Sequence, residues 1–386
     1  MLLGLYISVP FCRTKCTYCN FASNVFSRAV FEKYVDRVCA EIGAAPESAR
    51  QIGGSFERAA DSVYFGGGTP TLLEVSQLER IFVSIRQNFD LQPEAEITVE
   101  CAPGTLSEEK IEALAHSGVN RVSLGVQSFV DHEAASVGRL HKRDIVLDDI
   151  ARLRGAGISN VNVDLIAGLP QQTRASWESS LDELIATGVS HASVYMLEVD
   201  DDSRLGRELI AGGQKYHAHF VPDEDLIADM YEIACERLNA AGIQQYEISN
   251  FARTGFESKH NLKYWTREPY LGFGVDAHSM LHTEGGAIRF CNPDTLEKYV
   301  AVHGKSETIV GHAAALEEAL FLGLRLNRGV NVNSLSVTFG PSSVAAFSDL
   351  IVELVREDLL VNEETIRLTS KGRLLSNEVF ERVLSN

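Results

Sequence analysis

Three cysteines near the amino terminus have a spacing that can bind metal. Cys12, Cys16 and Cys19 form the pattern C-x-x-x-C-x-x-C. Three thiolates on one loop can bind three irons of a 4Fe-4S cluster, although four protein ligands normally hold such a cluster. The fourth iron is then free to take a small molecule, so the spacing predicts a cluster that performs chemistry on a bound ligand.

Two other kinds of site use closely spaced thiols. Zinc sites usually combine a C-x2-C pair with a second pair of cysteines or histidines, and the sequence has no such second pair. A disulfide with one spare thiol needs an oxidising compartment. Seven cysteines, three of them clustered, favour a reducing and cytoplasmic one instead. Isolated Cys39, Cys101, Cys235 and Cys291 are expected to be ordinary buried thiols.

Composition limits the classes of partner. The net charge of −18 disfavours a nucleic acid, whose phosphates require basic patches, and provides no polybasic membrane anchor. No apolar run reaches the ~18 residues of a membrane helix. The first residues are interpreted as a strand rather than a signal peptide. Peripheral membrane association stays open, as does the choice between a monomer and a dimer.

Short apolar runs alternate with amphipathic stretches over the first two-thirds of the chain. Strands are expected at residues 3–9, 62–65, 96–100, 121–126, 160–166 and 191–197. Helices are expected at residues 28–42, 76–88, 107–117, 143–156, 176–187 and 222–241, with an insertion at 43–60. Six strand–helix units predict an α/β fold with parallel strands, either as most of a barrel or as an open sheet.

In either arrangement a ligand binds at the carboxyl ends of the strands. Residues suited to chemistry stand there. Cys12 follows the first expected strand, and the glycines of residues 66–69 follow the second. Glu100 ends the third strand and Gln127 lies just past the fourth.

The remainder of the chain has a different pattern. Residues 1–243 are expected to form the α/β core, and residues 244–311 a loop-rich extension that contains one short strand at 245–249. Residues 312–386 are expected to form a small winged-helix-like domain, with helices at 316–326, 344–357 and 371–384 and a hairpin at 359–368. Because the chain is acidic, this domain is interpreted as a packing or lid domain rather than a DNA reader.

The motifs together resemble those of radical S-adenosylmethionine (SAM) proteins, and among them the group that contains anaerobic coproporphyrinogen III oxidase and the haem chaperone HemW. The resemblance rests on Tyr6, the three cysteines, and the segments GGGTPT (66–71), GVQSF (125–129) and DLIAGLP (164–170). It implies a partial (β/α)6 barrel, a 4Fe-4S cluster on Cys12, Cys16 and Cys19, and SAM on the open iron, where one electron would release a 5′-deoxyadenosyl radical.

The resemblance also implies a set of SAM contacts. These are Tyr6, Tyr18, Gly67, Gly68, Thr69, Glu100, Gln127, Arg139 and Asp164. Glycines let the backbone approach a ligand closely, and free N–H groups in this run could hold the SAM carboxylate. The Arg139 guanidinium offers two parallel donors to a carboxylate, and Asp164 can accept from a hydroxyl.

Two details distinguish members of this group. The oxidase carries a further cysteine two places after the third ligand, where this chain has Phe21, and it carries a longer segment ahead of the cluster. The segment His260–Trp265 fits the H-N-x-x-Y-W pattern associated with HemW. In that pattern a loop histidine, His260, is the candidate haem ligand and Tyr264 and Trp265 could cover the porphyrin. His278 is a weaker candidate, and His217 and His219 are expected in a solvated loop.

The resemblance therefore implies a haem chaperone that passes haem to a respiratory protein and could cleave SAM without decarboxylating a porphyrin. The alternative is an oxygen-independent coproporphyrinogen III oxidase, which converts propionates to vinyl groups. A radical SAM protein with an unrelated substrate is the third reading.

Overall fold

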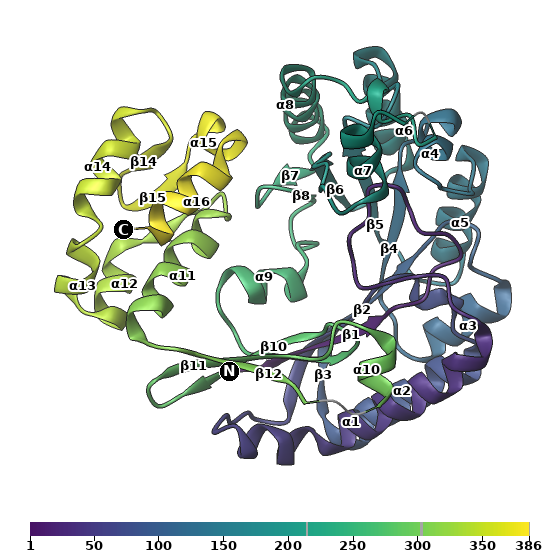
Figure 1. Ribbon diagram of the computed structural model, residues 1–386, viewed down its shortest axis with the longest axis horizontal. Coiled ribbons are helices and arrows are strands. Elements are labelled where there is room, and N and C mark those ends of the chain that lie inside the picture. The colour runs from purple at the N-terminus through teal and green to yellow at the C-terminus, as the bar shows by residue number, and fades with distance from the viewer. Residues whose placement is uncertain (214, 302–303, 386) are drawn as a thin grey trace.

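The computed structural model describes residues 1–213, 215–301 and 304–385 (Figure 1). Within them, a 12-stranded sheet runs in the order β12-β11-β10-β9-β1-β2-β3-β4-β5-β6-β8-β7. Six successive strands of this sheet are parallel. They are β1 (Leu3–Val9), β2 (Ala59–Gly67), β3 (Asp90–Cys101), β4 (Arg121–Gln127), β5 (Asn160–Ala167) and β6 (His191–Met196). The predicted α/β class is confirmed.

The sheet is open rather than closed. Its edges are β12 (Ser306–Val310) and β7 (Gln244–Gln245), which do not pair with each other in the described part of the chain. The sheet therefore does not close into a barrel within the described residues, as expected for the partial barrel that the resemblance implied. Beyond β1, the strand β9 (Tyr270–Gly274) continues the sheet in the parallel direction.

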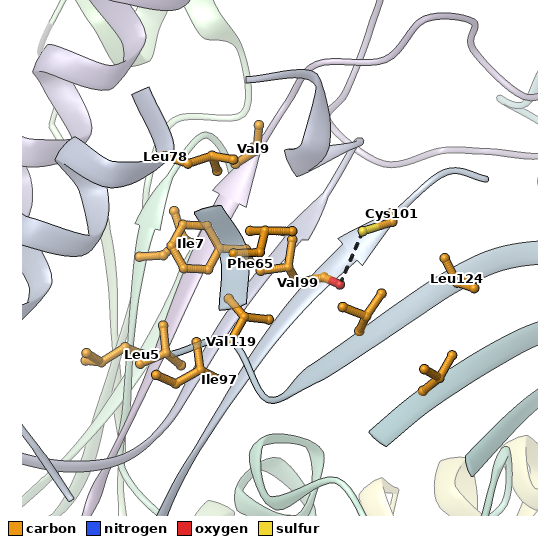
Figure 2. Close-up of a cluster of buried hydrophobic side chains, with 14 of the residues drawn as sticks. Leu5, Ile7, Val9, Phe65, Leu78, Ile97, Val99, Cys101, Val119 and Leu124 are labelled. Atoms are coloured by element: carbon orange, nitrogen blue, oxygen red, sulfur yellow. Dashed lines mark hydrogen bonds between the residues drawn. The ribbon is translucent and has the colours of Figure 1, made fainter. Parts of the chain in front are cut away.

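Helices cover the outer face of the parallel strands (Figure 1). They are α1 (Phe31–Gln51), α2 (Val75–Asn88), α3 (Glu108–His116), α5 (Arg143–Gly155), α6 (Arg174–Thr187) and α8 (Glu224–Ala240), with the shorter α4 (Asp131–Ser136) and α7 (Arg204–Ala211) between them. Figure 2 shows the apolar side chains below them, among which Leu5, Ile7 and Val99 are fully buried. Because strand side chains alternate between faces, the residues between these point to the inner face, which is polar.

The expected insertion at residues 43–60 is wrong in its first half. Helix α1 continues through Gly43 and Pro46 to Gln51, after a 3-10 turn at Arg28–Val30. The added turns bury Ala45 and Ala49 against the sheet, and this packing outweighs the helix-breaking tendency of glycine and proline.

The loop-rich description of residues 244–311 is also wrong. This segment contains β7, β8 (Asn250–Ala252), α9 (Lys259–Trp265), β9, β10 (His278–Thr283), β11 (Gly286–Cys291), α10 (Leu296–Val300) and β12. The expected strand at 245–249 is wrong as well, because only Gln245 lies in a strand, at the end of β7, and β8 begins at Asn250. These strands are too short for a sequence pattern to predict them. They are stabilised by pairing with strands that are distant in sequence, as β9 is by pairing with β1.

The carboxy-terminal region has helices at the three expected segments and the expected hairpin, together with helices within residues 332–345 and a third strand that were not expected. The helices are α11 (His312–Leu324), α12 (Val332–Phe339), α13 (Pro341–Ala345), α14 (Ser348–Arg356), α15 (Ser370–Leu374) and α16 (Ser376–Leu384). The sheet has the order β13 (Val330–Asn331), β15 (Thr365–Leu368), β14 (Leu360–Asn362). Its hydrophobic cluster also includes Met280 and Ala287 of the main sheet, so the region packs directly on β10 and β11.

None of the described helices combines the length and the apolar character needed to cross a lipid bilayer.

Candidate cofactor site

A cavity of about 380 Å³ lies at the carboxyl ends of the parallel strands. Its wall includes every cluster and SAM residue named from the sequence except Tyr6: Cys12, Cys16, Tyr18, Cys19, Gly67, Gly68, Thr69, Glu100, Gln127, Arg139 and Asp164. These residues gather because parallel strands bring their carboxyl ends to one edge of the sheet. Their roles toward a cofactor stay predictions.

The cysteine loop is anchored at both ends and from across the barrel. The N–H of Cys12 donates to the carbonyl of Asn24 at 3.0 Å. The Lys15 ammonium donates to the carbonyls of Phe21 at 2.6 Å and Ser23 at 2.8 Å. On the far side, the N–H of Thr17 donates to the carbonyl of Val137 at 3.2 Å. The loop therefore holds its three thiols on one wall of the cavity.

The glycine run at the end of β2 is shaped by close backbone contacts. Gly67 has φ of 100°, a region that favours glycine. A β-carbon on Gly68 would lie 2.6 Å from the carbonyl oxygen of Phe11, so only glycine fits there. The expectation of free N–H groups is wrong at three positions. The N–H of Gly68 donates to the carbonyl of Val9 and that of Thr69 to the carbonyl of Phe11, both at 2.7 Å, and the N–H of Gly67 donates to Glu100.

Glu100 is the charged group closest to this glycine run. It accepts from the Tyr64 hydroxyl at 2.8 Å and from the Gly67 N–H at 3.2 Å. Burial, and next the charge of Asp164, raise the pKa of Glu100 from 4.5 to about 7. A cationic ligand group in the cavity would favour the ionised carboxylate.

Asp164 is the second carboxylate of the cavity. It accepts from the Asn162 amide at 2.7 Å and from the Ser123 hydroxyl at 3.2 Å. Burial raises its pKa, and these hydrogen bonds oppose the rise. The two carboxylates give this wall a negative character suited to hydroxyl and ammonium groups.

Arg139 crosses from the strand ends to the cysteine loop. Its Nη1 lies 3.6 Å from Cys16 Sγ, and its Nη2 donates to the carbonyl of Gly125. A β-carbon on residue 125 would clash with this Nη2, so glycine is needed at that position. Its buried Nε has no hydrogen-bond partner in the described part of the chain. A buried unpaired donor beside a cavity is suited to a ligand acceptor. Gln127, at a bulge with φ of 70°, lies on the same wall.

Tyr6 borders a second cavity of about 250 Å³. This cavity shares Phe21, Ser23, Gly67 and Gly68 with the first one, so the two adjoin. Its remaining wall includes Tyr264, Tyr270, Asp276 and His278. Tyr6 therefore lies beside the same glycine run, in the neighbouring cavity.

The H-N-x-x-Y-W segment forms helix α9 and not the expected loop. His260 is 1% exposed, and both ring nitrogens are engaged: Nδ1 lies 3.0 Å from Ser62 Oγ and Nε2 lies 2.8 Å from the Tyr264 hydroxyl. Burial, and then nearby Lys263 and Arg121, lower the pKa of His260 to about 3. Trp265 lies apart from it, below the Arg325 guanidinium.

Sequence reasoning missed several polar side chains of the inner face. Tyr64 donates to Glu100, Ser123 and Asn162 donate to Asp164, and Tyr195 lines the same cavity. The alternation of polar and apolar residues in each strand is the signal that could have identified them. Among the isolated thiols only Cys101 is buried, whereas Cys39, Cys235 and Cys291 are partly exposed. His217, with φ of 61°, precedes a 3-10 turn.

Residues 6–184 match the radical SAM superfamily and residues 311–375 match the HemN C-terminal domain. The chain is 35% identical over 385 residues to a heme chaperone HemW from Lactococcus lactis, which covers 98% of this chain and 96% of the relative. It is 35% identical over 385 residues to a heme chaperone HemW from Bacillus subtilis, with 97% of each chain covered.

Among solved structures, the coproporphyrinogen III oxidase HemN of Escherichia coli superposes with a TM-score of 0.83 over 99% of this chain and 90% of that chain. At 24% identity this likeness shows the fold alone. The fold and the matched segments place the chain in the class of radical SAM proteins. Within that class, the similarity over nearly the full length places the chain in the HemW family.

Radical SAM proteins use SAM and a 4Fe-4S cluster, and the residues present fit both groups. Three thiols line one wall of the cavity, as a cluster with one open iron requires. The unpaired Arg139 Nε and the paired carboxylates stand on the other walls, where they can meet the carboxylate, ammonium and hydroxyl groups of SAM.

Proposed function

We propose that the protein is a haem chaperone that holds a SAM-ligated 4Fe-4S cluster and delivers haem to a respiratory protein. The observation that carries this proposal is the 35% identity to a heme chaperone HemW over 98% of the chain. In this proposal the protein acts in the cytoplasm. Its partners are haem and the protein that accepts haem, and it binds no nucleic acid. The acidic net charge of −18 supports the last point.

The chain's own residues would perform distinct tasks in this function. Cys12, Cys16 and Cys19 would hold the cluster, which with SAM supplies radical chemistry when bound. Glu100 and Asp164 would orient polar groups of SAM, and the Arg139 Nε–H would donate to its carboxylate. The cavity wall would keep water away from these contacts. SAM cleavage without porphyrin decarboxylation is part of the proposal.

Haem binding is proposed to involve His260, Tyr264 and Trp265. Because both ring nitrogens of His260 are hydrogen bonded, ligation of haem iron requires the bond to Ser62 or to Tyr264 to be exchanged. A shift of α9 away from β2 would achieve this. Exposed His278 provides the alternative ligand, at the rim of the second cavity.

The second candidate is the oxygen-independent coproporphyrinogen III oxidase, and the match of residues 311–375 to the HemN C-terminal domain is the observation that favours it. Phe21 argues against it. Phe21 stands at the position where the oxidase pattern has a fourth cysteine. The residue is 67% exposed and lines both cavities, so an apolar ring takes the place of a thiol there.

The test uses protein purified anaerobically with its cluster rebuilt. One sample receives hemin, and another receives coproporphyrinogen III with SAM and a reductant. A chaperone takes up hemin stoichiometrically and forms no protoporphyrinogen. Turnover to protoporphyrinogen would contradict the chaperone and support the oxidase.

A further inference from the structure

Three side chains of the kinds that bind metal ions meet beside the second cavity, at one end of a hairpin. Asp276 lies in the turn between β9 and β10, His278 is the first residue of β10, and Cys291 is the last residue of β11. The antiparallel register places His278 directly opposite Cys291. An imidazole and a thiol from two neighbouring strands therefore meet a carboxylate from the turn before β10.

The three ligand atoms have the spacing of a coordination shell. Cys291 Sγ lies 3.4 Å from His278 Nε2 and 3.7 Å from Asp276 Oδ1, and the last two atoms are 4.0 Å apart. A tetrahedral ion with bonds of about 2.0–2.3 Å separates its ligands by roughly 3.3–3.6 Å. An ion could therefore bind all three atoms after side-chain shifts of a few tenths of an ångström.

The backbone between these donors is held in place from both strands. The N–H of Asp276 donates to the carbonyl of Pro293 at 2.9 Å, and the N–H of Asn292 donates to the carbonyl of Ala277 at 3.0 Å. The Asn292 amide donates to the carbonyl of Gly274 at 2.8 Å. Asp276 has φ of 56°, an uncommon conformation for a residue other than glycine. This framework preorganises the donors.

We propose that Asp276, His278 and Cys291 bind a divalent cation of the zinc class, in addition to the cluster and SAM. A mixed sulfur, nitrogen and oxygen set selects Zn²⁺, Co²⁺ or Fe²⁺ rather than Mg²⁺ or Ca²⁺. Three protein ligands leave one position for water or a substrate atom, as in reactive zinc sites. Asp276 and His278 line the second cavity with Tyr6, so that position is accessible from the cavity.

Haem iron is a less suitable occupant of this site. A porphyrin fills four positions in its plane and leaves one axial position on each face. All three donor atoms lie within 4.8 Å of one another. If one of them bound the haem iron, the other two would lie against the macrocycle and could not reach the iron. The convergence of all three points to a bare ion.

The test must separate this site from the thiols of the cysteine loop. In one arm, Co²⁺ is added to a variant with Cys12, Cys16 and Cys19 changed to serine, and the thiolate-to-cobalt absorption band is measured. One Co²⁺ per chain is expected. Cys291→Ser in this background should abolish the band and weaken binding more than about tenfold, and Asp276→Asn should weaken it as well.

The matched control is Cys39→Ser, a change at another partly exposed thiol, which should leave the band intact. Circular dichroism establishes that each variant is folded. In the second arm, the cluster-loaded protein is dialysed against Zn²⁺, and Cys291→Ser should lower the zinc content by one per chain.

Three results would overturn the proposal. They are a folded background variant that binds no Co²⁺, a cobalt band that survives Cys291→Ser, and zinc content that this substitution does not change. If the background variant binds no Co²⁺ and Cys291→Ser lowers hemin uptake by the cluster-loaded protein, the thiol would instead be assigned to haem.

Discussion

The Gly67 N–H donates a hydrogen bond of 3.2 Å to the carboxylate of Glu100. This bond joins the last residue of β2 to the end of β3, and it holds the carboxylate at the wall of the proposed cofactor cavity. Because the same carboxylate also accepts from Tyr64, its position is fixed by two donors from one neighbouring strand.

Glu100→Gln is expected to weaken SAM binding by about 10- to 100-fold, because hydrogen bonds to a charged group contribute about 1.5–3 kcal/mol. Isothermal titration of the cluster-loaded protein with SAM measures the effect. The exposed residue Glu79 supplies the control, Glu79→Gln, which should bind SAM normally. Equal affinity in Glu100→Gln and the parent would show that this carboxylate does not contact SAM.

The raised pKa of Glu100 predicts a pH dependence of stability. Between pH 4.5 and about 7 the unfolded glutamate is ionised while the folded one keeps its proton, so the native state binds more protons. The free energy of unfolding therefore falls as the pH rises through this window. Urea unfolding of Glu100→Gln should show a smaller fall than the parent. Parallel profiles for the two proteins would contradict the assignment.

His260→Ala should destabilise the fold as well as affect haem. The substitution leaves Ser62 and Tyr264 without their buried partner, which should cost about 2–4 kcal/mol of unfolding free energy. Denaturant unfolding measures this cost, and hemin titration below the unfolding transition measures uptake separately. Folded His260→Ala that still takes up one hemin per chain would exclude this histidine as the ligand.

Arg325 connects the carboxy-terminal region to the core. Its guanidinium lies 4.2 Å from the Trp265 ring centroid and its Nη2 lies 3.4 Å from the Glu247 carboxylate, which is fully buried. Arg325→Met leaves that buried carboxylate without its cation and should cost about 3 kcal/mol. Arg382→Met is the matched control, because Arg382 is equally exposed at 23% but faces exposed acids, and it should cost less than about 1 kcal/mol. Similar unfolding energies for both variants would contradict this account.

The sequence predicted the parallel core well because each strand repeats polar and apolar residues with a period of two and is followed by a long amphipathic helix. The gathering of Cys12, Glu100 and Gln127 at one edge of the sheet followed from that topology, whereas Asp164 was named through the resemblance. Helix α9 could not be predicted in the same way. Its first N–H groups at Lys259 and His260 donate to the carboxylate of Glu96, more than 160 residues away.

The burial of His260 shows the same limit. A histidine in a seven-residue helix carries no local signal for its partners, and Ser62 lies 198 residues away in sequence. The donor set of Asp276, His278 and Cys291 likewise depends on a hairpin register that the short strands β10 and β11 do not reveal in their composition.

Electron paramagnetic resonance tests the central claim most directly. The anaerobically reduced protein, with its cluster rebuilt, is measured before and after addition of SAM. A 4Fe-4S signal that shifts with SAM is predicted, and Cys16→Ala should abolish both the signal and SAM cleavage. A parent protein whose iron–sulfur signal is unchanged by SAM, or a Cys16→Ala variant that still cleaves it, would contradict the claim that three cysteines leave one iron open to this cofactor.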